Sequence, residues 1–186
     1  MDLLERVDIK ALRKALEKGD MVLTDVTPRG ETVSITAMTL VNAPPQKVWD
    51  VVTNYNDYKN FTPLVNKSEV KERKGNKVTV EFVAGVKFAF LSINGRILLE
   101  QTHHPIDSIE YRRVGGSLNM MQGYWRILEV DNGNKSIMCC KVAADLRDIN
   151  KAIGFLLERI PFLIGPLLYA GIGIIGAAVK KKIEKG

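Results

Sequence analysis

The sequence predicts a single α+β domain in which a curved antiparallel sheet closes over a long C-terminal helix. Residues 67–146 read as strand after strand joined by short turn sequences, with no helical segment between them. Short connections of this kind join antiparallel neighbours, whereas parallel strands need longer crossovers. Helical patterns precede and follow this region, and the last one contains an uncharged run of 20 residues, Ile160–Val179. A length of 186 residues, 46% of them hydrophobic and 26% charged, suits one domain with a sizeable core.

The N-terminal residues 1–30 predict a helix and a strand that extend the main domain, residues 31–186. Leu4–Lys18 carries apolar residues at helical spacing with charges on the opposite side. Met21–Val26 is a short strand candidate, and a Thr-Pro-Arg-Gly turn follows it. Thr32–Val41 is rich in β-branched residues, so we expect these two strands to pair as a hairpin.

Two short helical segments and six further strands come next. A proline suited to a first helical turn precedes Gln46–Asn54, and Tyr55–Leu64 is a second short helical or irregular piece. Turn sequences rich in glycine, asparagine, aspartate and proline separate the strands. The strand candidates are Ser68–Arg73, Lys77–Val86, Phe88–Gln101, Ser108–Val114, Ser117–Val130 and Ser136–Leu146. The chain turns helical again at Asp148–Ile160, and a final helix extends to Lys185.

Charge and cysteine content limit the class of protein. The formal net charge of +6 owes much to Lys180–Lys182 and Lys185, where cations suit the negative end of a helix dipole. The sequence has no motif of aromatic and basic residues that would stack on bases, so we expect no nucleic-acid partner. Cys139 and Cys140 are adjacent, so within a strand they point to opposite faces and are expected to be buried, reduced thiols. The N-terminus does not resemble a signal peptide, so we expect a cytoplasmic protein.

The uncharged run 160–179 could just cross a bilayer core of about 30 Å as a helix. Its prolines and glycines break the run, and Lys180–Lys182 would then lie outside, against the positive-inside tendency. The meander also needs an element to cover its concave face. We therefore favour a buried, gripping helix over a spanning helix or a helix on a membrane surface. Since nothing polar marks a water-facing side, we expect the outer face to meet a second protomer, a membrane or the N-terminal helix.

No catalytic, metal-binding or cofactor-binding motif stands out. His103 and His104 lie in a predicted loop, with no Asp, Glu or Cys at metal or triad spacing, so we expect solvated surface residues. Gly171–Gly176 spells GxGxxG but does not lie between a strand and a helix of a βαβ unit. We therefore expect no metal ion and no cofactor.

Three motifs fall in order along these elements. Asn42–Val52 stands where a strand meets the first short helix, Asn54–Val65 holds a Tyr, Tyr, Phe, Pro series, and Gln122–Ile127 holds Gly-x-Trp in a late strand. In this order they resemble the polyketide cyclase/dehydrase and coenzyme Q-binding branch of the START-like (SRPBCC) superfamily. The resemblance covers Thr32–Lys185, about four-fifths of the chain, and implies a helix-grip fold. The N-terminal extension and the very apolar last helix depart from the usual pattern of this family.

The resemblance implies a cavity between the sheet and the last helix that holds an isoprenoid quinone, another lipid or a polyketide-like aromatic molecule. Strand parity indicates that Met121, Gly123 and Ile127 share a face with Trp125, and that one of two adjacent methionines faces inward in either register. The candidate lining residues are Phe61, Leu64, Phe82, Phe88, Phe90, Met120, Met121, Trp125, Phe162 and Tyr169, with Tyr111, Arg112 and Asn119 as candidates to orient a polar head. Each of them could equally be an ordinary core residue.

Binding or transport of a hydrophobic small molecule is the function that this reasoning favours. The alternatives are a polyketide cyclase or dehydratase, and a non-catalytic interaction module that uses the apolar C-terminal helix. No acid–base pair can be named, so we favour a binding protein over an enzyme. The expected partner is a hydrophobic ligand, with peripheral membrane contact or a homodimer through the C-terminal helix as further options.

Overall fold

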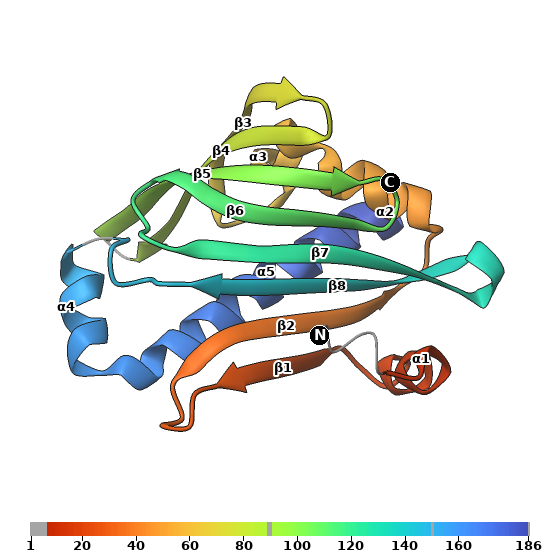
Figure 1. The fold of residues 1–186 in the computed structure, drawn as a ribbon, viewed down its shortest axis with the longest axis horizontal. Helices are drawn as coiled ribbons and strands as arrows, with labels where there is room; N and C mark the ends of the chain where they lie inside the picture. Colours follow the sequence, from red (N-terminus) through yellow and green to blue (C-terminus); the bar gives the residue numbers. More distant parts are fainter. Residues whose placement is uncertain (1–6, 89–90, 150, 186) are drawn as a thin grey trace.

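An eight-stranded antiparallel sheet forms the body of the protein in the computed structural model, which describes residues 7–88, 91–149 and 151–185. The strands are β1 (Met21–Val26), β2 (Thr32–Val41), β3 (Val65–Lys74), β4 (Lys77–Phe88), β5 (Leu91–His104), β6 (Ser108–Gly116), β7 (Met121–Val130) and β8 (Lys135–Ala144). Their order in space is β1-β2-β8-β7-β6-β5-β4-β3 (Figure 1). Strands β3 to β8 lie side by side in chain order, which confirms the predicted meander, and the β1–β2 hairpin joins it at β8.

Register shifts help to curve this sheet. One shift falls in the pairing of β1 with β2, two fall in the pairing of β3 with β4, and another falls in the pairing of β5 with β6. An extra residue in one strand of a pair bends that strand and increases its twist. The sheet therefore has a concave face, which becomes the wall of the core.

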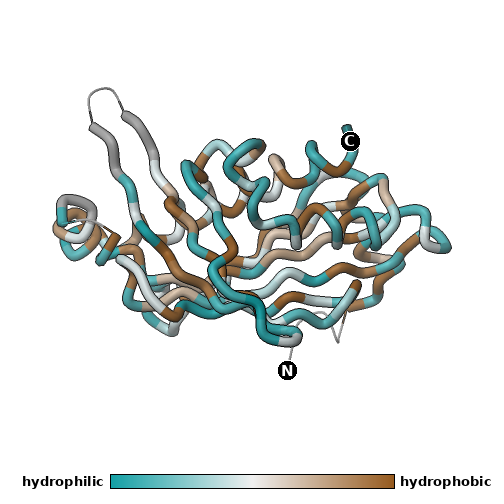
Figure 2. Tube along the Cα trace, turned by 90° about the horizontal axis from the view of Figure 1, so that it is seen from above, coloured by the Kyte–Doolittle hydropathy of each residue, from teal (hydrophilic) through white to brown (hydrophobic). Residues whose placement is uncertain are grey.

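Except for the N-terminal helix, the helices lie behind the strands and at their ends. They are α1 (Ile9–Leu16), α2 (Pro45–Thr53), η2 (Tyr55–Asp57), α3 (Tyr58–Phe61), η3 (Asp131–Gly133), α4 (Lys151–Arg159), η4 (Pro161–Leu163) and α5 (Ile164–Lys185). In Figure 1, α5 runs diagonally behind the strands from the α4 end of the sheet to the α2 end. Seen from above in Figure 2, this C-terminal helix lies on one side of the sheet, so helix and sheet form two layers.

Helix α5 grips the concave face through one apolar stripe. Leu168, Ile172, Val179 and Ile183 are buried at helical spacing and belong to the main core. At the start of the helix, Gly165 approaches β2 so closely that a Cβ would lie 2.5 Å from the side chain of Thr32. A glycine is required there to bring the helix against the strand.

The segment Pro161–Lys185 is long and apolar enough to cross a bilayer, judged by length and composition alone, and 22% of its most apolar window is buried. Its place against the sheet is nevertheless the gripping arrangement that the sequence favours. Much of its outer face stays exposed, including Tyr169 and Ile174.

Polar contacts fasten the C-terminal half of α5. The Lys182 ammonium lies 3.1 Å from a carboxylate oxygen of Asp57, and the Lys180 ammonium donates to the Thr39 hydroxyl at 3.2 Å. The Glu184 carboxylate accepts from the backbone N–H at position 42 at 3.0 Å. These lysines therefore do more than balance the helix dipole, because they tie the helix to η2 and β2.

Helix α1 packs on the opposite, convex face of the sheet. Leu12 and Leu16 form a second apolar cluster with residues of β2 and β8, and Cys139 belongs to it, whereas Cys140 faces the main core. The Arg13 guanidinium binds the Asp131 carboxylate through two contacts of 2.5 and 2.8 Å. Helix α1 is therefore not the element that covers the outer face of α5, which was one of the three expected occupants.

Several predicted boundaries differ from the structure, including those at the N-terminal helix, β7 and β5. The N-terminal helix is described from Ile9 to Leu16, and residues 1–6, which include the start of the predicted Leu4–Lys18, lie outside the described residues. Strand β7 begins at Met121 and not at Ser117, because the positive φ of Gly116 turns the chain first. Strand β5 continues to His104, so the two histidines lie in a strand and not in a loop.

Candidate ligand-binding cavity

A cavity of about 220 Å³ lies between the concave face of the sheet and the N-terminal half of α5, and we refer to it as the α5 cavity. Half of its lining residues lie on β4 to β8, and the cavity is closed on one side by α5 and at the ends by η2, α3 and the segment before α4. The lining residues are Tyr55, Tyr58, Val65, Phe82, Ala84, Ile97, Leu99, Gln101, Tyr111, Leu118, Met121, Trp125, Cys140, Val142, Ala144, Leu146, Ile149, Leu167, Leu168, Gly171, Ile172 and Ile175. The wall is therefore overwhelmingly apolar, as binding sites for hydrophobic molecules are.

Three tyrosines reach this cavity, and two of them use their hydroxyl hydrogens elsewhere. Tyr58 donates to the backbone oxygen of Val52 at 3.0 Å, and Tyr111 donates to the backbone oxygen of Lys141 at 2.7 Å. The Tyr111 ring passes over Gly123, where a Cβ would lie 2.6 Å from the Tyr111 oxygen. Burial raises the pKa of both phenols well above the usual value, so both stay neutral.

One buried polar atom in the described wall has no hydrogen-bond partner. Gln101 is 4% exposed and lines the cavity from β5, and its Oε1 atom is buried without a partner. A buried amide oxygen of this kind costs free energy when it is left unsatisfied. Native proteins contain few such groups, and each requires an explanation.

His103 is not the solvated surface residue that the sequence predicts. Its ring is partly buried, its Nε2 lies 2.6 Å from the Tyr55 hydroxyl, and it packs edge-on against Trp49. Burial lowers the His103 pKa, which favours the neutral ring. The imidazole itself does not line the α5 cavity, but it supports Tyr55, which does.

Four of the predicted candidates line the α5 cavity: Phe82, Tyr111, Met121 and Trp125. Trp125 and Met121 share the inward face of β7, as strand parity predicts, and Ile127 on the same face is buried in the core. Met120 is 41% exposed, so the inward member of the methionine pair is Met121.

Three candidate residues, two polar and one apolar, do not line the cavity. Arg112 lies on the convex face, where its guanidinium binds Glu100 at 2.7 Å, because it follows the inward-facing Tyr111 directly and neighbours in a strand alternate. Asn119 is exposed in the bend before β7 and donates to Asp148 at 2.5 Å. Neither residue is placed to orient a ligand, and Met120 is exposed just before β7 and does not line the cavity.

The remaining aromatic and aliphatic candidates lie beside the cavity or outside it. Phe61 and Leu64 are half-buried, and Phe61 packs against Tyr58 with Lys182 over its ring. Phe162 is 75% exposed on η4, and Tyr169 is exposed on α5, where it borders a separate hollow beside β2. Phe88 ends β4 with an undescribed side chain, and Phe90 lies outside the described residues.

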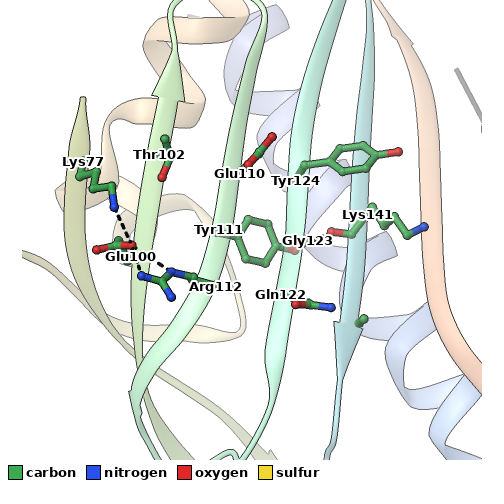
Figure 3. A pocket seen from close by; sticks show the side chains of 11 residues that line it. Lys77, Glu100, Thr102, Glu110, Tyr111, Arg112, Gln122, Gly123, Tyr124 and Lys141 are labelled. Atoms are coloured by element: carbon green, nitrogen blue, oxygen red, sulfur yellow. Dashed lines mark hydrogen bonds and ion pairs between the residues drawn. The ribbon is translucent and has the colours of Figure 1, made fainter. Parts of the chain in front are cut away.

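A larger and shallower depression of about 540 Å³ lies on the convex face of the sheet (Figure 3). Its side chains are mostly charged or polar, and Glu100 pairs there with Arg112 and Lys77. An ionic surface open to water does not suit an apolar molecule. The α5 cavity is therefore the better candidate site.

Sequence reasoning missed several lining residues. Gln101 stands two residues after Leu99 and four after Ile97, so strand parity places all three on one face, and this signal was present in the sequence. The contributions of Tyr55 and Ile149 had no comparable signal. They depend on how the short helices and the segment before α4 fold over the ends of the sheet.

The sheet, the gripping helix and the enclosed apolar cavity define a START-like helix-grip protein. The family model for polyketide cyclase / dehydrase and lipid transport matches residues 41–161, which is more than half of the chain. The protein belongs to this family. None of the curated proteins compared with the sequence matches it.

Solved structures agree on the fold. A protein from Thermus thermophilus has a TM-score of 0.66 at 17% identity, over 81% of this chain and 96% of that one. A START superfamily protein from Mycobacterium smegmatis has a TM-score of 0.60 at 9% identity, over 82% and 97%. The Zhui aromatase/cyclase from a Streptomyces species has a TM-score of 0.54 at 16% identity, over 78% and 92%. At these identities the likeness establishes the fold and not the activity.

Proposed function

We propose that this protein binds and carries a hydrophobic small molecule, an isoprenoid quinone or another lipid, in the α5 cavity. The observation that carries this proposal is the chemistry of the wall. Among the described lining residues there is no Asp, Glu, His, Lys or Arg, while aliphatic and aromatic residues come from every side. Such a wall favours a ligand that is mostly hydrocarbon.

The same wall favours carriage over catalysis. General acid–base chemistry needs a group whose pKa lies near the working pH. Burial raises the pKa of Tyr55, Tyr58, Tyr111 and Cys140, which keeps all four protonated at neutral pH. A cyclase or dehydratase acting on a polyketide-like substrate is the alternative, and the family description and the Zhui likeness are its support.

The test is native mass spectrometry of the purified protein followed by lipid extraction. Gly171 lines the α5 cavity from the helix, whereas Gly173 faces the separate hollow beside β2, and neither Cβ would meet a described atom within 4 Å. We expect an isoprenoid or other lipid to copurify with the wild type and with Gly173→Leu, and to be lost from Gly171→Leu. A ligand-free mass in all three proteins with strong self-association would favour the interaction module. Turnover of a polyketide-like substrate would favour the enzyme.

We further propose a cytoplasmic protein that contacts membranes through an exposed apolar surface, the α4 surface. It consists of Phe155, Leu156, Phe162 and Leu167, which are between 44% and 75% exposed. The Arg159 guanidinium lies 4.3 Å from the centre of the Phe155 ring, so a cation borders the apolar residues, as at membrane interfaces. Leu167 also lines the α5 cavity, which would place the cavity opening at the membrane.

Cosedimentation with anionic lipid vesicles tests this surface. We expect Phe162→Ser to lower the bound fraction, whereas Val33→Ser, which replaces an exposed apolar residue of β2, should leave it unchanged. Equal binding by both variants would contradict the proposal. Self-association that Phe162→Ser abolishes would indicate a second protomer in place of the membrane.

A further inference from the structure

The unpartnered amide of Gln101 suggests which ligands the α5 cavity accepts. Gln101 is 4% exposed and lines the cavity, and its buried Oε1 atom has no hydrogen-bond partner among the described residues. An apolar residue of similar size would fill this place without that cost. A polar group kept at the wall of an apolar cavity has a clear use if the ligand supplies its partner.

The neighbouring polar groups do not satisfy this amide. Tyr111, opposite Gln101 in the register of β5 and β6, donates its hydroxyl hydrogen to the backbone of β8. Tyr58 donates to the backbone of α2, and the Tyr55 hydroxyl contacts His103. The hydroxyl groups of these three tyrosines thus form their contacts within the protein. The Gln101 amide oxygen remains the polar atom of the described cavity wall that lacks a hydrogen-bond partner.

We propose that Gln101 recognises a hydroxyl group at the buried end of an otherwise apolar ligand, such as an isoprenoid or other long-chain alcohol. A hydroxyl both donates and accepts, so it satisfies the amide whichever way the oxygen and nitrogen of Gln101 are oriented. The wall around it offers no charged group among the described residues, so a carboxylate or phosphate head would have no counter-charge. This inference rests on the proposed function and narrows its ligand class.

The position of Gln101 also sets the direction of binding. Along β5 the lining residues run from Ile97 through Leu99 to Gln101. Gly95, just before Ile97, lies against Ile149 near α4, while His103, just after Gln101, contacts Tyr55 near α2. The exposed lining residue Leu167 belongs to the α4 end of α5. The ligand therefore enters with its hydroxyl first and leaves its hydrocarbon end near the α4 surface.

The test compares farnesol with farnesyl methyl ether, which keeps the hydrocarbon and removes the hydroxyl hydrogen. Binding is followed by the change in intrinsic fluorescence of the full-length protein, whose two tryptophans include Trp125 in the cavity wall. We expect the wild type to bind the alcohol at least about tenfold more tightly than the ether, because the ether leaves the buried amide without its best partner. Gln101→Leu should reduce this preference to within about twofold while retaining affinity for the ether.

Two further variants make the outcome decisive. Gln122→Leu makes the same replacement at an exposed position on the convex face, outside the α5 cavity, and should keep the preference for the alcohol. Gln101→Met provides a second apolar replacement if Gln101→Leu does not fold. Equal affinity of the wild type for both probes, or a preference that survives both replacements of Gln101, would overturn this inference and leave the proposed function standing. Absence of binding by both probes would overturn this inference, and a ligand-free mass of the purified protein would overturn the proposed function as well.

Discussion

Replacement of Gly171 by alanine should raise the free energy of unfolding by about 1 kcal/mol, because glycine is the least favourable residue other than proline inside a helix. Gly171 lies within α5, and a Cβ built there meets no atom of the described chain within 4 Å. The gain in helix propensity is therefore not offset by a clash. In a protein of about 150–250 residues, a change of this size raises Tm by about 2–4 °C. Thermal unfolding followed by far-UV circular dichroism measures it directly.

Gly165 supplies the matched control, since it lies in the same helix but against β2. A Cβ at Gly165 would lie 2.5 Å from the Thr32 hydroxyl oxygen, so Gly165→Ala should crowd a buried contact. Overpacking of this kind costs about 1–3 kcal/mol and outweighs the helix gain, so Tm should fall. A Gly171→Ala protein that melts at or below the wild-type temperature would refute the reasoning. It would mean that position 171 is filled or unwound, and the α5 cavity would lose its open wall.

Three further predictions concern stability. Ile106 has a φ of 66°, a backbone conformation that is unfavourable for a β-branched residue, so Ile106→Gly should stabilise the β5–β6 turn by about 1 kcal/mol in urea unfolding; an unchanged midpoint would contradict the strain. Hydrogen bonds from Lys67 and then Arg96 lower the pKa of Glu81 from 4.5 to about 2. Its contribution is therefore complete above pH 4.5 and is lost as the pH falls toward 2, a dependence that Glu81→Gln should weaken when Tm is followed against pH. Leu16, the last residue of α1, is 4% exposed where the helix packs on the sheet, so Leu16→Ala should cost about 2 kcal/mol, and a smaller loss would show that α1 packs loosely on the sheet.

The fold was predictable because its elements are marked by local chemistry. The Thr-Pro-Arg-Gly turn separates β1 from β2, and the predicted bounds of both strands agree with the structure. The chain of short turns between residues 67 and 146 excluded crossover helices, so an antiparallel meander was the remaining arrangement. The C-terminal helix could be placed against the sheet because no other element was long enough to cover it.

The site was less predictable because each strand residue faces the opposite side of the sheet from its neighbours, so every residue must be assigned to a side separately. Tyr111 and Arg112 were both candidates for the cavity, yet adjacent residues of a strand cannot face the same side. A register shift between Leu98 and Leu99 adds a change of pairing that sequence periodicity does not reveal. Gln101 and Tyr111 could have been assigned together by parity, but the missing partner of Gln101 depends on where Tyr58 and Tyr111 send their hydrogens, which only the coordinates give.

The uneven fastening of α5 has a mechanical consequence. Among the described residues, the side-chain hydrogen bonds and ion pairs from α5 to other elements arise at Lys180, Lys182 and Glu184. The half of the helix around Leu167 and Gly171 is held by apolar contacts, which have no preferred direction and permit sliding. If α5 moves about residues 180–184, its N-terminal end is displaced most. A bulky ligand could then enter at that end while the cavity wall near Gln101 keeps its shape.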